Sequence, residues 1–300
     1  MARVPEQYTR AGKLARELRE WILGNVSPPQ TCLEIATRVE EEIARRGGRP
    51  AFPTGIGING VTAHYAPQDG DERRIGEEDV VKVDYGVHFD GYIADTAVTV
   101  TESPKYQLMV ETTKRALEAA IEVAKRDPRT GEIGRAIEAA AKREGFKTIS
   151  NLSGHTVEQY TVHAGKSIPN VYAPNQPTLR RDEVFAIEPF LTPGDAAGYV
   201  IDDPEDKRVT IYSLVMRKRT GVRELDDLVD RIWEDRKSLP FTPRWYADGY
   251  APGRLPKLLE ELEKRRIARG YPTLVEASNS PVAQFEHTMK LEGNALVILT

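Results

Sequence analysis

Two aspartates, Asp84 and Asp95, lie inside the otherwise strand-like stretch VVKVDYGVHFDGYIADTAVTV at residues 80–100. Mostly apolar, β-branched runs on both sides of a turn are typical of two paired strands. Asp90-Gly91 favours the turn, because glycine adopts positive φ without a steric penalty. Such a hairpin raises the question of why a sheet would carry two carboxylates, and what chemistry the pair could do.

A two-residue turn places Asp84 and Asp95 on the same face of the hairpin, whichever residues form it. With Phe89-Asp90 as the turn they are directly opposite each other, and with Asp90-Gly91 they are diagonal neighbours. Ionised carboxylates this close repel each other and need protons, a cation or water. The stretch therefore predicts either an exposed face with two solvated acids or a metal site with further ligands elsewhere in the chain.

The composition limits the classes of protein to consider. The chain has 300 residues, enough for one large domain or two ordinary ones, and a formal net charge of −4 at pH 7. This charge gives no electrostatic case for nucleic acid. Cys32 is the only cysteine, so no intramolecular disulfide can form. Neither a signal core nor a membrane-length apolar run is present, so we expect a cytoplasmic protein with no membrane or nucleic-acid partner.

Helical and strand patterns interleave along the chain. Thr31 and Glu34 form a capping-box pattern at the start of one helix, and Ser103-Pro104 is expected to begin another. The expected helices cover residues 5–24, 31 to about 47, 103–126 and 131–144. The expected strands and strand-like loops cover residues 52–66, 80–100, 147–173, 183–190 and 274–300, and the terminal ALVILT is expected to be central in a sheet.

Residues from about 210 to 270 differ from the rest because they are highly charged and carry two helical patterns. The apolar positions recur at helical spacing in both: Leu225, Leu228, Val229, Ile232 and Trp233, then Leu255, Leu258, Leu259 and Leu262. The second pattern opens at Pro256 and is expected to close at Gly270. We therefore expect a helical insertion between two strands of the main body.

Three further residues could ligate a metal together with the aspartate pair. His155 lies in NLSGHTVEQY, Glu188 in FAIEPF and Glu286 in AQFEHTM, where a strand or tight loop would bury each of them. Taken singly, each has an ordinary interpretation: a glutamate on a strand usually faces water, and a histidine is more often a surface or hydrogen-bonded residue than a ligand.

Four segments together resemble the type 2 methionine aminopeptidases, in their compact archaeal form. They are AHYAPQDGDERRIGEEDVVKVDYGVHFDGYIADTAVTV, GHTVEQYTVHAGKSIPN, FAIEPF and AQFEHTM, in this order along the chain. The resemblance covers essentially the whole chain and includes the helical insertion, which separates type 2 from type 1. It implies the pita-bread α/β fold: one catalytic domain over residues 1–300, with a curved antiparallel sheet, helices on its outer face, and the insertion at about 210–270.

The resemblance also implies a site with two divalent metal ions per chain, of Co, Mn, Fe or Zn. Asp84 would bind one ion, His155 and Glu188 the other, and Asp95 and Glu286 would bridge both. Two divalent cations would balance four carboxylates, which answers the question raised by the aspartate pair. The activity implied is hydrolysis of the first peptide bond by a metal-bridging hydroxide, and an oxygen-rich ligand set favours Mn, Fe or Co over a thiolate-type zinc site.

Other residues receive roles from the same resemblance. His64 and His163 would flank the substrate and donate hydrogen bonds, and Glu188 would also move a proton from the nucleophile to the leaving amine. Phe52 and Tyr271 match positions near the apolar pocket for the methionine side chain. From the sequence alone, Phe52 and Tyr271 are equally well interpreted as core aromatics.

The expected partner is the N-terminal methionine of nascent polypeptides, which implies transient proximity to the ribosome, and we expect a monomer. Two rival interpretations stay open. A proline-specific (Xaa-Pro) aminopeptidase would share the fold, although relatives of that kind often carry an extra N-terminal domain. A non-enzymatic protein that binds RNA or ribosomes could also use the fold, although such proteins lose metal ligands, and all five positions here carry ligating residues.

Overall fold

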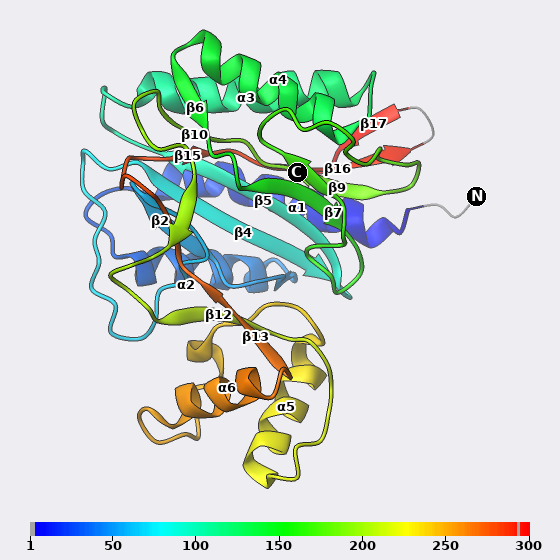
Figure 1. The fold of residues 1–300 in the computed structure, drawn as a ribbon. Coiled ribbons are helices and arrows are strands. Elements are labelled where there is room, and N and C mark those ends of the chain that lie inside the picture. Colours follow the sequence, from blue (N-terminus) through cyan, green and yellow to red (C-terminus); the bar gives the residue numbers. More distant parts are fainter. Residues whose placement is uncertain (1–3, 293–294) are drawn as a thin grey trace.

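A curved layer of antiparallel strands with helices on its outer side forms the body of the protein, and a smaller helical part lies below it (Figure 1). The computed structural model describes residues 4–292 and 295–300. None of the helices in these ranges is long and apolar enough to cross a membrane.

Two helices cover the first part of the strand layer. The α2 helix begins with the predicted capping box, in which the Glu34 N–H donates to Thr31 Oγ1 (3.1 Å) and the Thr31 N–H donates to Glu34 Oε2 (2.7 Å). The strands run in the order β1-β4-β2, with β5 paired to β4. The bounds are α1 Glu6–Asn25, α2 Cys32–Arg45, β1 Arg49–Pro50, β2 Gly55–Ile58, β4 Val81–Phe89 and β5 Tyr92–Val100.

Two further helices, α3 and α4, cover the second part of the layer (Figure 1). Its largest sheet has the strand order β17-β16-β9-β7-β8, and a second sheet has the order β15-β10-β6. The bounds are α3 Gln107–Ala124, α4 Thr130–Arg143, β6 Phe146–Thr148, β7 Ser153–Val157, β8 Ser167–Pro169, β9 Val184–Ile187, β10 Phe190–Pro193, β15 Ala283–Gln284, β16 His287–Glu292 and β17 Ala295–Ile298.

Buried threonine hydroxyls connect the two parts along the seam between β5 and the β15–β16 segment. Thr288 Oγ1 accepts from the Asp95 N–H (2.8 Å) and donates to the Asp95 carbonyl (2.7 Å). Thr96 Oγ1 donates to the Glu286 carbonyl (2.7 Å), and Thr99 Oγ1 donates to the Gln284 carbonyl (2.7 Å). These bonds place the first-half strand that carries Asp95 directly beside the second-half segment that carries Glu286.

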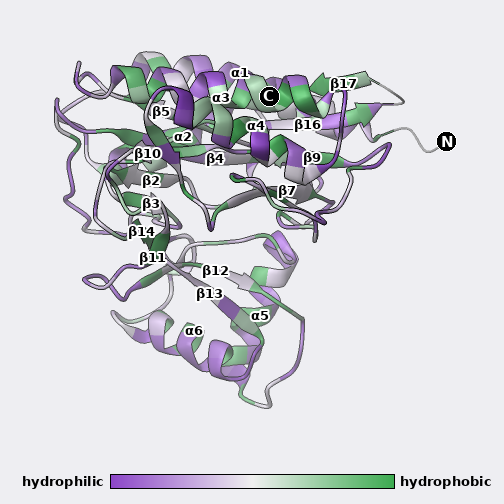
Figure 2. Ribbon diagram, turned by 45° about the horizontal axis from the view of Figure 1, so that its top comes forward, coloured by the Kyte–Doolittle hydropathy of each residue, from purple (hydrophilic) through white to green (hydrophobic). Residues whose placement is uncertain are grey.

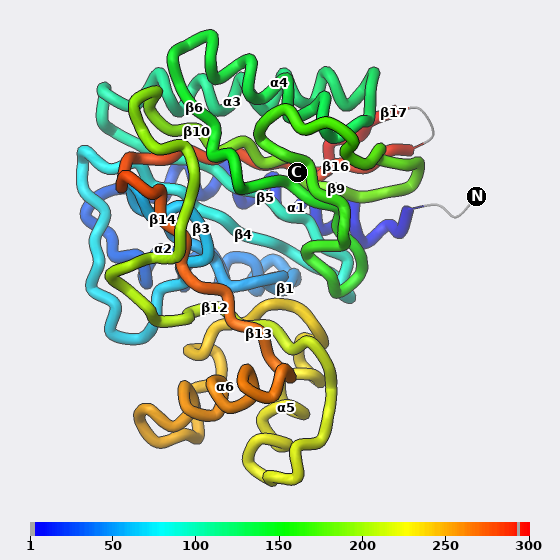
Figure 3. Tube along the Cα trace, viewed as in Figure 1, coloured from blue at the N-terminus to red at the C-terminus, as the bar shows by residue number. Residues whose placement is uncertain are grey.

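The insertion is attached to the body through the paired strands β12 and β13, which run side by side in Figure 3. The predicted leucine-rich stripes are buried in one shared core, while α6 is otherwise largely hydrophilic (Figure 2). The bounds are β12 Val209–Leu214, α5 Arg223–Arg236, the 3-10 helix η1 Pro243–Tyr246, α6 Arg254–Lys264 and β13 Ala268–Pro272; β3 Val61–Ala63, β11 Val200–Asp202 and β14 Leu274–Glu276 form a further sheet.

Two predicted boundaries are wrong. The α3 helix begins at Gln107 rather than at Ser103-Pro104, because the Ser103 hydroxyl donates to Glu78 (2.6 Å) instead of capping the helix, and a turn follows it. The α6 helix ends at Lys264, and Gly270 lies in β13.

The C-terminal strand also differs from its prediction, because β17 is an edge strand and not a central one. It pairs with β16 alone, and Ile298 is 36% exposed. The end of the chain is apolar for another reason: Leu299 is buried against Gly12 of α1. Its backbone carbonyl accepts a hydrogen bond from Arg16 (2.9 Å).

Candidate metal centre

The hairpin that carries the two aspartates adopts one of the two predicted registers. Asp95 pairs with Gly86, and Asp84 pairs with Ala97, so the aspartates are diagonal neighbours. Asp90 and Gly91 form the turn with positive φ values of 51° and 82°. The alternative of an exposed face with two solvated acids is wrong, because Asp95 is only 3% exposed and both carboxylates line one cavity.

Three other elements bring the remaining candidate ligands to the same cavity. His155 lies on β7, Glu188 lies between β9 and β10, and Glu286 lies between β15 and β16. The strand predicted over residues 183–190 is therefore interrupted at Glu188 and Pro189, where proline lacks the N–H that would continue a ladder. The interruptions turn both glutamates toward the cavity.

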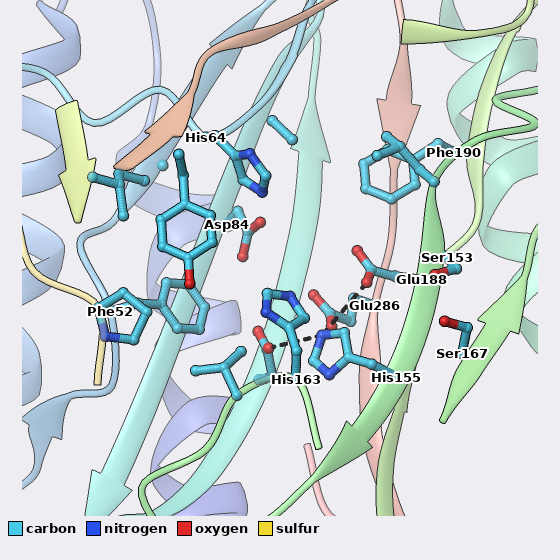
Figure 4. Close-up of a pocket in the computed structure, with 18 of the residues that line it drawn as sticks. Phe52, His64, Asp84, Ser153, His155, His163, Ser167, Glu188, Phe190 and Glu286 are labelled. Carbon is cyan, nitrogen blue, oxygen red and sulfur yellow. Dashed lines mark ion pairs between the residues drawn. The ribbon is translucent and has the colours of Figure 1, made fainter. Parts of the chain in front are cut away.

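The candidate ligands converge closely (Figure 4). One ligand atom each from Asp95, His155 and Glu286 lie within 4.8 Å of one another. His155 Nε2 is 3.6 Å from Asp95 Oδ2 and 3.6 Å from Glu188 Oε1. Asp84 lines the same cavity. The structure thus brings together all five residues that the sequence singled out for this role.

Burial perturbs every ionisable group of the cluster in the metal-free protein. Desolvation raises the pKa of Asp84 to about 7. Desolvation first, and the neighbouring carboxylates second, raise the pKa values of Asp95, Glu188 and Glu286 well above their usual range. Burial and the adjacent His163 lower the pKa of His155 to about 3, so its imidazole is neutral at pH 7 and free to ligate.

The donor set fits divalent cations. Within residues 4–292 and 295–300, no lysine or arginine forms an ion pair with any of the four carboxylates. Arg19, whose charge favours the ionised form of Glu286, donates to the backbone carbonyl of Glu286 (3.2 Å) and not to its carboxylate. Asp84 Oδ1 and Glu286 Oε1 are enclosed and have no hydrogen-bond partner. Buried, unpartnered carboxylate oxygens are costly unless a cation is bound, and oxygen-rich sets with one imidazole suit Mn, Fe or Co.

All five candidate ligands line a cavity of about 480 Å³. Part of its wall is apolar and part is polar; Figure 4 shows Phe52 on one side of the carboxylates, and Phe190 together with Ser153 and Ser167 on the other. The apolar lining includes Phe52, Val162, Phe190, Ile211 and Tyr271, and the polar lining includes Asn151, Ser153 and Ser167. From the sequence alone, Phe52 and Tyr271 could equally have been core aromatics. In the structure both line this cavity.

Two histidines that do not belong to the candidate ligand set face the same space (Figure 4). The His163 ring lies 4.4 Å from the His155 ring, and the His64 ring lies 5.6 Å from the Tyr271 ring. Burial lowers the pKa of His64 to about 4 and also lowers the pKa of His163. His64 has a positive φ of 61°, rare for a non-glycine residue, and its Nδ1 is buried without a partner.

Sequence reasoning missed the residues that support the cluster from behind. Gln284 Nε2 donates to Glu188 Oε2 (3.3 Å), and Thr288 holds both backbone polar groups of Asp95. Gln284 and Thr288 each lie two residues from Glu286 in the AQFEHTM segment. Polar residues at alternating positions around a candidate ligand could therefore have indicated this supporting role. Arg269, which also lines the cavity, carried no such signal.

Comparisons with known proteins agree with this geometry. The family model described as "Metallopeptidase family M24" matches residues 6–229 of this chain. Proteins named methionine aminopeptidase are similar to this chain: one from Pyrococcus horikoshii is 41% identical over 98% of this chain and 99% of its own length, and one from Saccharolobus solfataricus is 40% identical over 97% and 95%.

Solved structures show the same fold at low sequence identity. A methionine aminopeptidase from Thermotoga maritima has a TM-score of 0.69, at 23% identity over 100% of this chain and 99% of that one. A thermophilic Arx1 has a TM-score of 0.80, at 15% identity over 98% and 89%. A prolidase from Pyrococcus furiosus has a TM-score of 0.62, at 16% identity over 98% and 63%. The predicted pita-bread fold is confirmed, and the chain belongs to metallopeptidase family M24.

Proposed function

We propose that this chain is a metal-dependent aminopeptidase that removes the N-terminal methionine from peptides and nascent proteins. The observation that carries the proposal is the convergence of four carboxylates and one neutral imidazole at the buried end of a cavity with an apolar wall. Support also comes from the names of relatives that are about 40% identical over nearly the whole chain.

The five side chains would hold two divalent ions. Asp84 would hold one ion, His155 and Glu188 the other, and Asp95 and Glu286, from the two sides of the seam, would contact both. When bound, two divalent ions would supply a water of lowered pKa as the nucleophile and would polarise the carbonyl that is attacked. The four carboxylates would then be ionised, because cations offset the desolvation and the mutual repulsion that raise their pKa values in the metal-free protein.

His163 and His64 would stabilise the charge that develops on the substrate. Both imidazoles are neutral at pH 7, because burial lowers their pKa values. A neutral ring can donate a hydrogen bond to the oxyanion or to the scissile amide without repelling bound cations. His163 is the stronger candidate for the oxyanion contact, since its ring lies 4.4 Å from the ring of His155.

Glu188 would move the proton. Its Oε1 lies 3.6 Å from His155 Nε2, and Gln284 holds its other oxygen in place (3.3 Å). A carboxylate fixed in this way can accept the proton of the attacking water and pass it to the leaving amine.

The apolar side of the cavity would bind the methionine side chain. Phe52 is fixed by close packing on Gly86, where an added Cβ would lie 2.4 Å from the Phe52 ring. Tyr271 is held by a 3.1 Å hydrogen bond to Ser213 and packs edge-on against His64. The free α-amine of the substrate would lie at the acidic end, and an internal residue has no such amine, so the enzyme would be an exopeptidase.

Mass spectrometry of a Met-Ala-Ser peptide tests the proposal directly. Chelator-treated protein is incubated with the peptide alone, with Mn²⁺ and with Co²⁺, and an Asp95→Asn variant of confirmed folding serves as the control. Loss of one methionine that requires both the metal and Asp95 is expected. Intact peptide under all conditions would refute the proposal, and cleavage of a Xaa-Pro peptide instead would favour the proline-specific alternative.

A further inference from the structure

An exposed guanidinium, that of Arg269, lines the same cavity as the buried acidic cluster. We propose that Arg269 is a specificity residue that binds a carboxylate on the third or fourth residue of the substrate, so that peptides with Asp or Glu at these positions are preferred. This inference deepens the proposed function and rests on it.

Arg269 is exposed but belongs to the cavity wall. It lies on β13, where it pairs with Ser213 of β12, and it lines the cavity together with His64 and His163. Its Cζ atom is 5.3 Å from the centre of the Tyr271 ring. Its charge contributes to the lowered pKa values of both His64 and His163, which places it close to the residues that would flank the substrate.

The charge of Arg269 is not neutralised by the protein. Within the described part of the chain its guanidinium forms no hydrogen bond and no ion pair, and Tyr271 is its only cation-π partner. The other cation of the cavity wall, Lys166, is bound by Glu183 (2.5 Å) and by the Thr178 carbonyl (2.9 Å). Asp202 is near enough to raise the pKa of His64, but it forms no ion pair with Arg269. Arg269 is therefore available to an external anion.

The depth of the cavity decides which part of a substrate meets Arg269. The N-terminal residue would occupy the buried end, where Asp95 and Glu286 are at most 3% exposed, and the rest of the peptide would leave through the open end. Arg269 is exposed and therefore lies on the solvent side of the cavity, with its Cζ atom 5.3 Å from the Tyr271 ring. An extended chain advances about 3.3–3.6 Å per residue, so the third and fourth residues would lie about 7–11 Å from the first and are the ones expected on the solvent side. A guanidinium can bind a carboxylate through two parallel hydrogen bonds.

Competition between peptides measures the preference. Met-Ala-Glu-Ser-Gly, Met-Ala-Gln-Ser-Gly and Met-Ala-Lys-Ser-Gly, all as C-terminal amides, are mixed with the Mn²⁺-loaded enzyme, and mass spectrometry gives their relative kcat/KM values. A second set carries Glu, Gln or Lys at the fourth position. At low salt the wild type is expected to prefer Glu over Gln by about two- to fivefold at one of these positions, the range for a solvent-exposed ion pair.

Variants separate this role from a structural one. Arg269→Gln should abolish the preference by raising KM for the Glu peptide to the value for the Gln peptide, with kcat on the Gln peptide unchanged. Arg269→Glu should reverse the preference, so that the Lys peptide is cleaved best. Arg143→Glu on α4, which is exposed and away from the cavity lining, makes the same charge change and should keep the wild-type preference. Equal Glu and Gln rates in the wild type, or an unchanged preference in Arg269→Glu, would overturn the inference while leaving the proposed function intact. No cleavage of any peptide by the wild type would overturn both.

Discussion

Replacing Asp84 with asparagine is expected to stabilise the metal-free protein, and the stabilisation should grow with pH. Burial raises the pKa of Asp84 from 3.8 to about 7. Above about pH 7 this shift lowers the free energy of unfolding of the wild type by about 4 kcal/mol, at about 1.4 kcal/mol for each pKa unit. The cost arises because the folded protein holds a carboxylate whose Oδ1 has no partner, whereas the unfolded chain solvates it.

The direction follows from the raised pKa. Below about pH 3.8 the carboxyl group is protonated in both states and does not favour unfolding. As the pH rises toward 7, the unfolded chain ionises first, so the wild type loses stability, and the loss is complete above the folded pKa. Asparagine cannot ionise. The increase in the free energy of unfolding caused by Asp84→Asn should therefore grow from about 1 kcal/mol at pH 4.5 to about 4 kcal/mol at pH 8.

Urea unfolding of chelator-treated protein at pH 4.5, 6 and 8, followed by tryptophan fluorescence, measures this gain at constant ionic strength. Asp195→Asn, which removes an exposed carboxylate outside the cavity, is the matched control. Addition of Mn²⁺ should stabilise the wild type by about 2.7 kcal/mol at one hundred times its dissociation constant, and Asp84→Asn much less. A stability difference between Asp84→Asn and wild type that stays constant across this pH range would refute the reasoning.

Three other predictions test separate parts of the molecule. His163→Ala is expected to lower kcat on Met-Ala-Ser by about 10²–10³ with metal content unchanged, measured by turnover and elemental analysis; full turnover would exclude the oxyanion role. Phe52→Ala should raise KM for Met-Ala-Ser by roughly tenfold or more, because burial of methionine on that ring is worth about 1.5–3 kcal/mol; an unchanged KM would place Phe52 outside the pocket. Glu40→Gln should destabilise the protein by about 3 kcal/mol, because the buried Glu40 accepts hydrogen bonds from Arg244 of the insertion (2.5 Å), from Trp245 (2.8 Å) and from the Thr54 N–H (3.1 Å). Thermal unfolding checks this last value, and a loss no larger than that of the exposed neighbour Glu41→Gln would contradict it.

The sequence was sufficient for most helices and for the aspartate hairpin. The apolar stripe of residues 5–24 is buried along α1, and the Thr31–Glu34 capping box forms as predicted. Helices and tight turns depend mainly on residues close in sequence, so periodicity and turn chemistry determine them. For the same reason, the hairpin restricted Asp84 and Asp95 to two registers, of which the structure has one.

Boundaries that depend on distant partners were not predictable. Ser103 does not cap α3, because its hydroxyl bonds to Glu78, which is 25 residues away. The C-terminal segment is apolar because Leu299 packs on α1 and not because its strand is central. In both cases a tertiary contact overrides a correct local signal.

The candidate site divides in the same way. The sequence by itself determined the hairpin and placed its two aspartates on one face, and the resemblance of four segments pointed to the other three candidate ligands. Only the tertiary structure decided that these five residues meet, because the hydrogen bonds of Thr96 and Thr288 join segments 190 or more residues apart. It also decided that the Arg269 guanidinium lines the cavity without a hydrogen bond or an ion pair to any described residue. Charge neutralisation in space depends on which distant residues a fold brings together, and no spacing along the chain encodes it.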